Sequence, residues 1–138
     1  MGKLEKLREA LQTQNLDALL ITNDYNRRYM TGFTGTTGVA IVSQNDAVFI
    51  TDFRYTEQAG QQVKGYRIVE NKRTIMEEIA NQVKLMGIKT LGFEKDTVSY
   101  SMFEIYSKLI SAELVGVSGI IENIRLIKTP EEIKIIKV

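Results

Sequence analysis

Residues 39–51 read Val-Ala-Ile-Val-Ser-Gln-Asn-Asp-Ala-Val-Phe-Ile-Thr, two mainly apolar runs around the polar residues 44–46. Each run has the length and the β-branched content of a buried strand. Gln44, Asn45 and Asp46 suit a tight turn, because Asn and Asp tolerate left-handed backbone conformations. The stretch therefore predicts a β-hairpin, which makes any sheet that contains it at least partly antiparallel.

Outward from this hairpin, strands and helices alternate along the chain. Strand-like runs occupy residues 17–22, 65–69, 90–94 and 113–117, and helical periodicity occupies residues 4–11, 54–62, 75–86 and 101–110. Thr74 with Glu77, and Ser101 with Glu104, have the capping-box spacing that starts a helix. Residues 23–28 are polar and are expected to form a loop. This order indicates an α/β fold, a mixed β-sheet flanked by helices.

Composition excludes several classes of function. The 138 residues contain 18 Lys and Arg and 17 Asp and Glu, a balance that argues against nucleic acid or a membrane surface as a partner. The sequence has no cysteine and no histidine, so it lacks thiolate chemistry and the commonest general base and metal ligand. Its apolar stretches are far shorter than the roughly 20 residues that cross a bilayer, and its first residues do not resemble a signal peptide. We therefore expect a cytoplasmic location.

A glycine-rich stretch, residues 31–38 (Thr-Gly-Phe-Thr-Gly-Thr-Thr-Gly), is the first candidate site and is called the glycine loop below. Its glycine spacing and the strand that follows do not match a nucleotide-binding loop, which needs a helix N-terminus at that place. Two interpretations stay open. The glycines provide the positive φ angles of a turn, or the loop presents Phe33 to a ligand or partner.

Residues 52–57 (Asp-Phe-Arg-Tyr-Thr-Glu) lie where a strand ends and a helix begins, a position that often borders a site in open α/β sheets. In one interpretation Asp52 caps the helix and Tyr55 packs on the sheet. In the other, Arg54 clamps a carboxylate of a ligand. A two-metal nuclease site could in principle use Asp17, Asp24, Asp52 and Glu94, but no spacing in the sequence brings these carboxylates together.

The C-terminal residues contain a strong helix start. Thr129, Pro130 and Glu132 occupy the N-cap, first and third positions of a helix whose apolar stripe stops with the sequence at Val138. A helix of about nine residues is marginal alone. It is either a small docking helix or the beginning of a further domain.

Five segments taken in order resemble one known family. They are residues 17–21 (Asp-Ala-Leu-Leu-Ile), 29–35 (Tyr-Met-Thr-Gly-Phe-Thr-Gly), 51–59 (Thr-Asp-Phe-Arg-Tyr-Thr-Glu-Gln-Ala), 92–94 (Gly-Phe-Glu) and 125–133 (Arg-Leu-Ile-Lys-Thr-Pro-Glu-Glu-Ile). The first four are similar to the N-terminal domain of the creatinase/prolidase/aminopeptidase P family. The fifth resembles the linker and first helix of that family's catalytic domain. The resemblance implies a ribonuclease H-like N-terminal domain over residues 1–124 and the start of a pita-bread catalytic domain over residues 125–138.

The resemblance also implies a function. Family members hydrolyse the bond before proline with two divalent metal ions, of Mn or Co type, held in the catalytic domain. By this likeness the chain holds no catalytic or metal-ligating residue, and its partners are its own catalytic domain, a second subunit in a homodimer and a short proline-containing peptide. The alternative is a stand-alone α/β module that binds a small molecule or another protein.

The resemblance implies two groups of site residues in this chain. The loop that approaches the partner subunit's substrate pocket corresponds to Tyr29, Thr31, Gly32, Phe33, Thr34 and Gly35. A second group on the substrate side, carried by Arg54, comprises Asp52, Arg54 and Tyr55.

Overall fold

The computed structural model describes residues 2–126. Its elements in chain order are α1 (Lys3–Thr13), β1 (Ala18–Ile21), α2 (Asp24–Thr31), β2 (Val39–Ser43), β3 (Ala47–Thr51), α3 (Thr56–Gln62), β4 (Arg67–Glu70), α4 (Ile75–Leu85), β5 (Thr90–Glu94), α5 (Tyr100–Leu109), β6 (Glu113–Val117) and α6 (Ile120–Leu126). Within this range no helix is long and apolar enough to cross a membrane. The helix start expected at Thr129 lies outside the described residues.

The six strands form one sheet in the order β4-β3-β2-β1-β5-β6. The hairpin strand β2 runs antiparallel to both of its neighbours, β1 and β3, with Leu20 opposite Ile41 and Ala40 opposite Phe49. The remaining pairs, β1 with β5, β5 with β6 and β3 with β4, are parallel. The predicted mixed sheet is therefore confirmed, and its antiparallel part comes from the hairpin of residues 39–51.

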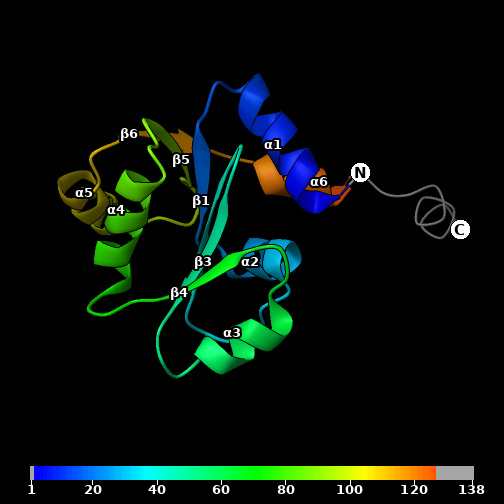
Figure 1. The fold of residues 1–138 in the computed structure, drawn as a ribbon. Helices are drawn as coiled ribbons and strands as arrows, with labels where there is room; N and C mark the ends of the chain where they lie inside the picture. Colours follow the sequence, from blue (N-terminus) through cyan, green and yellow to red (C-terminus); the bar gives the residue numbers. More distant parts are fainter. Residues whose placement is uncertain (1, 127–138) are drawn as a thin grey trace, which may run out of the picture.

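Helices cover both faces of the sheet (Figure 1). On one face, which we call the loop face, α1, α2, α3 and α6 pack on a core that contains Leu7, Leu11, Phe33 and Phe49. On the other, the aliphatic face, α4 and α5 pack on a core that is rich in Ile, Val and Leu. Successive residues of the central strands β1, β2 and β3 alternate between the two cores, as the pleat of a strand requires.

Two helix starts show how local sequence fixes the elements. Thr74 accepts a hydrogen bond from the backbone N–H of Glu77 (3.1 Å), so the predicted N-cap of α4 is confirmed. For α5 the predicted cap is wrong by two residues. Ser99, not Ser101, accepts from the N–H of Met102 (3.2 Å), and Ser101 lies within the first turn of the helix.

Two helices are absent from the sequence-based prediction. Residues 24–31 form α2 rather than a loop, with Asn23 as the N-cap and Gly32 as a left-handed C-cap. The inward side of α2 holds Asn26, Arg27 and Thr31 beside one buried apolar residue, Met30, so it lacks the apolar stripe that reveals an amphipathic helix. The second helix is α6, which extends to Leu126 across the domain boundary expected after residue 124. That boundary stays a prediction.

Candidate functional site

The glycine loop lies at the end of the sheet where all the parallel strands finish. It connects α2 to the first residue of β2, beside the last residue of β1 (Ile21 pairs with Ala40) and the last residue of β3. The hydroxyl of Thr51 donates to the carbonyl of Thr37 at 2.6 Å and so ties the loop to β3. In open α/β sheets, ligands bind beyond the carboxyl ends of the strands, so this end is the candidate functional site.

Arg27 of α2 fixes the shape of the glycine loop from inside. Its guanidinium donates from Nη1 to the carbonyl of Gly38 (2.9 Å) and from Nη2 to the carbonyl of Gly35 (2.7 Å). The side chain is buried, and this burial lowers the pKa of Arg27, while Asp24 at 3.4 Å partly opposes that shift. A guanidinium stays charged under such conditions. Arg27 thus works as a charged clamp that bridges two points of the loop.

Phe33 is not an exposed side chain of the glycine loop. Its ring is fully buried in the core of the loop face, 4.7 Å from the ring of Phe49 and 5.9 Å, edge to face, from that of Tyr55. The Arg27 guanidinium lies 5.6 Å from the Phe33 ring centroid. Flanking glycines suggested a free aromatic side chain. The loop instead folds back over the end of the core, so that Phe33 supports it from below.

The three glycines are required for two different reasons. Gly32 has φ +81°, the left-handed conformation that closes α2. At Gly35 a Cβ atom would lie 2.4 Å from the Phe33 ring, and at Gly38 it would lie 2.5 Å from the Phe49 ring. Positive φ angles therefore explain only Gly32, whereas Gly35 and Gly38 allow the backbone to approach buried aromatic rings.

The polar residues of the loop are also held in place. Thr31 accepts from the N–H of Phe33 through its hydroxyl, and the N–H of Thr34 donates to Gln62 of α3 (3.0 Å). The hydroxyls of Thr36 and Tyr55 are 2.8 Å apart. Tyr29 lies elsewhere: its ring and carbonyl face α1, where the ammonium of Lys3 contacts both. The structure thus brings together all the predicted loop residues except Tyr29.

The turn after β3 contains a closed ion pair rather than a free arginine. The guanidinium of Arg54 donates to both carboxylate oxygens of Asp52, at 3.2 and 2.7 Å, and the backbone N–H of Arg54 donates to the same carboxylate. The Arg54 hydrogen bond lowers the pKa of Asp52, and the Asp52 hydrogen bond raises the pKa of Arg54. Asp52 closes this turn and does not cap α3, whose N-cap is Tyr55.

The surface of the loop borders an open cleft of about 380 Å³. Its walls come from α2 and from the loop: Asp24, Tyr25, Arg27, Arg28, Phe33, Thr34, Gly35 and Thr36. Tyr25 is strongly exposed beside this cleft, and Phe53 is equally exposed on the turn after β3. Sequence reasoning missed Tyr25 and Arg27, because both lie in a polar stretch that was read as a loop.

The described residues contain no group of three Asp or Glu side chains that could hold a metal ion. Asp17 binds the N–H groups of Lys89 and Thr90 at the start of β5, whereas Glu94 ends that strand, so these carboxylates lie at opposite ends of the sheet. The described residues therefore do not provide the set of ligands that two metal ions need.

Comparison with known proteins identifies the family. The sequence profile described as the creatinase/prolidase N-terminal domain matches residues 3–127, which is nearly the whole chain. The chain belongs to the creatinase/prolidase N-terminal domain family. The resemblance seen in the sequence motifs and the predicted fold class are both confirmed.

Three relatives differ in how much of their own length matches this chain. The uncharacterized peptidase YqhT of Bacillus subtilis (strain 168) is 51% identical over 136 residues, which cover 98% of this chain and 38% of that protein. A solved Xaa-Pro dipeptidase from Bacillus anthracis is 50% identical, with a TM-score of 0.90 over 96% of this chain and 37% of its own. The solved N-terminal domain of the cytoplasmic peptidase PepQ from Mycobacterium tuberculosis H37Rv is 31% identical, with a TM-score of 0.81, covering 88% of this chain and 97% of that one. The chain thus spans less than two fifths of the first two relatives.

Proposed function

We propose that this chain is the non-catalytic N-terminal domain of a metal-dependent Xaa-Pro peptidase, and that its glycine loop borders the substrate pocket of a partner subunit. The observation that carries the proposal is the construction of the loop. Buried groups hold it from within, namely Arg27 and the ring of Phe33, while its outer surface opens onto the cleft beside Tyr25. A loop held in one arrangement suits a pocket that must recognise a short peptide.

The relatives support the same proposal. One is named an Xaa-Pro dipeptidase and another a peptidase, and most of each lies outside the region that matches this chain. We place the catalytic groups and the two divalent metal ions in such a further region. We also assign to this domain a part in the contact between two subunits, and a cytoplasmic location like that named for PepQ.

The role of Phe33 in this proposal is indirect. Its buried ring supports the backbone of Gly35, so it sets the height of the loop and does not itself contact the peptide. Contact with a bound peptide falls to exposed groups of the cleft, above all to Tyr25, whose ring offers apolar area and whose hydroxyl offers a hydrogen bond.

The test uses the longer protein in which this chain is the N-terminal part, loaded with Mn²⁺ and given an Xaa-Pro dipeptide. Tyr25→Ala should reduce kcat/KM by about 10-fold, which corresponds to about 1.4 kcal/mol of lost contact. The matched control is Tyr100→Ala on α5, since the two tyrosines are 74% and 76% exposed and lie on different faces of the sheet. The control should leave kcat/KM unchanged.

The 138-residue chain alone, under the same conditions, should release no proline above the rate with Mn²⁺ only. Turnover by the chain alone would overturn the non-catalytic role. Equal kinetics of the Tyr25 and Tyr100 variants would overturn the pocket role.

A further inference from the structure

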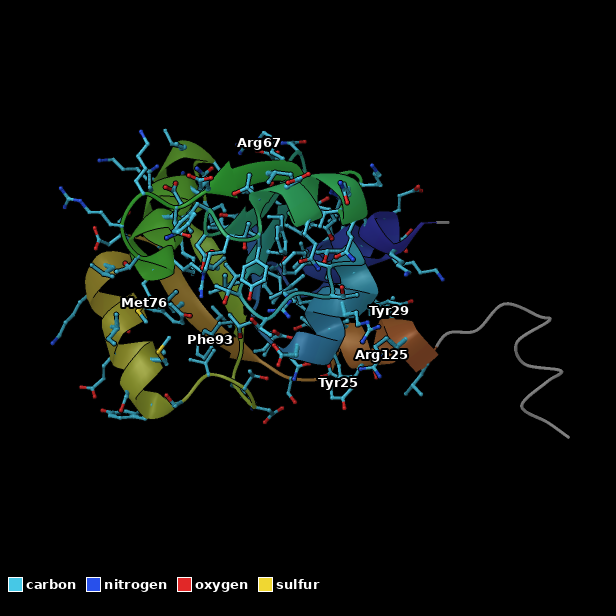
Figure 2. All side chains as sticks on the ribbon, turned by 90° about the horizontal axis from the view of Figure 1, so that it is seen from below. Tyr25, Tyr29, Arg67, Met76, Phe93 and Arg125 are labelled. Atoms are coloured by element: carbon cyan, nitrogen blue, oxygen red, sulfur yellow. The ribbon has the colours of Figure 1, made fainter. Side chains whose placement is uncertain are left out.

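A buried amide connects three elements at the carboxyl end of the sheet. Asn26 of α2 is fully buried, and its Nδ2 donates to Glu94 at the end of β5 (2.6 Å) and to Glu122 of α6 (3.0 Å). Its Oδ1 accepts from Nη1 of Arg125 on α6 at 3.3 Å. Figure 2 shows Arg125 beside α2. The amide nitrogen and the amide oxygen of Asn26 are therefore both hydrogen bonded to α6.

Glu94 extends this network to the start of α2. Its Oε1 accepts from the backbone N–H groups of Thr22 (2.7 Å) and Asn23 (2.9 Å), the two residues that connect β1 to α2. Its Oε2 accepts from Asn26. One buried carboxylate thus fixes both the beginning of α2 and the side chain that reaches α6.

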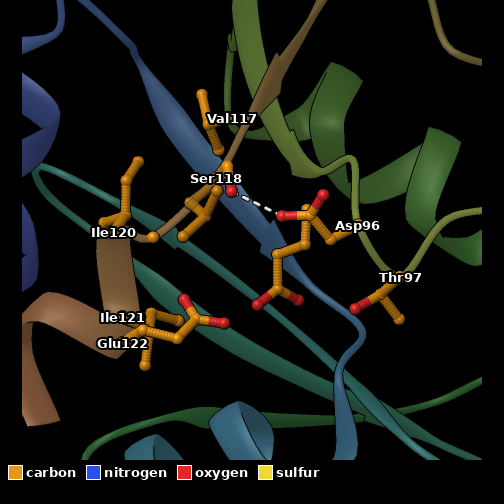
Figure 3. Close-up of a pocket in the computed structure, with 10 residues that line it drawn as sticks. Asp96, Thr97, Val117, Ser118, Ile120, Ile121 and Glu122 are labelled. Atoms are coloured by element: carbon orange, nitrogen blue, oxygen red, sulfur yellow. Dashed lines mark hydrogen bonds between the residues drawn. The ribbon is translucent and has the colours of Figure 1, made fainter.

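The start of α6 is fixed by the neighbouring strand ends as well. Figure 3 shows Glu122 facing a cavity of only about 20 Å³, together with Asp96 and Ser118, whose side chains are hydrogen bonded to each other. Ser118 follows β6 directly, and Asp96 follows β5 by two residues. Little free volume separates α6 from the sheet, so α6 has little room to shift without moving these contacts.

The orientation of the Asn26 amide is determined by charge. Its N–H₂ faces two carboxylates and its oxygen faces a guanidinium. A flipped amide would place an oxygen against two carboxylate groups and a donor against a cation, so it would lose all three contacts. The network therefore has one arrangement.

The next residue along α2 is the clamp of the glycine loop. Asn26 binds α6, and Arg27 binds the carbonyls of Gly35 and Gly38. Helix α2, which carries both residues, is short and is capped at both ends, by Asn23 and by Gly32. Because a hydrogen-bonded helix is a rigid element over this length, a displacement of either contact is expected to be passed to the other.

We propose that Asn26 is a positioning residue that couples the placement of α6 to the arrangement of the glycine loop. A shift of Glu122 or Arg125 rotates or translates α2 and moves Arg27, which then releases or tightens the loop. The coupling is a property of the chain itself. Its consequence for substrate, a change in KM when α6 is displaced, rests on the proposed function.

The first experiment uses the 138-residue chain and measures amide hydrogen exchange at Phe33 and Thr34, whose N–H groups donate to Thr31 and Gln62. The double variant Glu122→Ala/Arg125→Ala removes both α6 contacts of Asn26. Exchange at these two amides should rise by about 10-fold, although both mutated residues lie on another helix. Asn123→Ala, on the exposed side of the same helix, is the matched control and should leave exchange unchanged.

A double-mutant cycle then tests whether Asn26 carries the effect. Asn26→Ala removes both the N–H₂ donor and the oxygen acceptor that reach α6. In that background the two α6 substitutions should change loop exchange by less than about 2-fold, because the connection is already broken. A 10-fold rise that persists in the Asn26→Ala background would overturn the proposal. If Asn26→Ala does not fold, Asn26→Ser takes its place in the cycle.

Equal exchange in the α6 double variant and the Asn123→Ala control would also overturn the coupling. A separate measurement in the longer protein distinguishes this outcome from failure of the proposed function. If loop exchange responds as expected but neither the α6 variant nor Tyr25→Ala changes KM for an Xaa-Pro dipeptide, the coupling stands and the pocket role fails.

Discussion

The two faces of the sheet are built by different means. On the loop face, aromatic rings and buried polar groups meet at the carboxyl end of the sheet, with Asn26, Arg27, Thr31, Thr51 and Glu94 all buried. On the aliphatic face, the core consists mainly of Ile, Val and Leu side chains, and among residues 2–126 its buried polar side chain is Gln82, which contacts Glu78 and Arg67. Figure 1 shows α4 and α5 alone on that side.

The two kinds of core contribute differently: one mainly adds to the free energy of folding, and the other determines where its elements lie. Aliphatic cores tolerate exchanges of similar volume, because dispersion contacts have no fixed direction. A buried hydrogen bond has direction, and leaving one of its partners unsatisfied costs about 1–3 kcal/mol. The loop face therefore specifies where α2 and the glycine loop lie, whereas the aliphatic face mainly holds the sheet together.

The largest expected effect comes from the aromatic centre of the loop face. Phe33→Ala should lower the free energy of unfolding by about 3–5 kcal/mol, because it leaves a cavity between Phe49 and Tyr55. Phe53→Ala is the control, since that ring is exposed, and should change stability little. Urea unfolding of both variants measures the difference. A small loss for Phe33→Ala would mean that the loop does not depend on this ring.

A somewhat smaller effect is expected from the clamp. Arg27→Met keeps most of the buried stem but leaves the carbonyls of Gly35 and Gly38 without their donor, so we expect a loss of about 2–4 kcal/mol. Arg28→Met, at the next and exposed position of α2, should have little effect. Urea unfolding again provides the measurement. Equal stability of the two variants would show that the polar contacts of the loop face add nothing to its packing.

The same contrast explains what the sequence could predict. The hairpin of residues 39–51, the strands of the sheet and the cap at Thr74 were predictable, because they depend on apolar runs and local capping. Helix α2 was not, since its inward side carries two polar residues in place of an apolar stripe: Asn26, whose partner Glu94 is 68 residues away, and Arg27, which binds the glycine loop. The family was recognisable from five short motifs, two of which meet where the rings of Phe33 and Tyr55 pack edge to face.

The site itself was only partly predictable. The glycine loop was found because glycines are conspicuous, but the burial of Phe33 depends on ring packing with Phe49 and Tyr55, residues 16 and 22 positions away. The two interpretations of residues 52–57 stayed open, because neither includes the pairing of Arg54 with Asp52 that the structure shows. No periodic pattern reports the packing of Phe33, which arises only when the strand ends come together.

The smallest expected effect compares two buried tyrosines, one on each face. Burial raises the pKa of Tyr66 on the loop face well above the usual value near 10, with Arg8 opposing slightly, and burial also raises the pKa of Tyr106 on the aliphatic face. A folded-state pKa above the unfolded value means that stability is complete below about pH 10 and falls as pH rises toward the folded pKa, because only the unfolded chain releases the proton.

Tyr66→Phe should cost less than about 1 kcal/mol at pH 7, where the Tyr66 hydroxyl donates a long hydrogen bond (3.4 Å) to the carbonyl of Met30. Between pH 10 and 11 it should flatten the decline in stability more than Tyr106→Phe does, because the pKa shift of Tyr66 is the large one. Urea unfolding at pH 7, 9, 10 and 11, with the exposed Tyr100→Phe as the control for general alkaline effects, measures all three slopes. If the Tyr66→Phe and Tyr100→Phe curves remain parallel up to pH 11, Tyr66 is solvated in the folded protein and the loop face is less tightly closed than its contacts indicate.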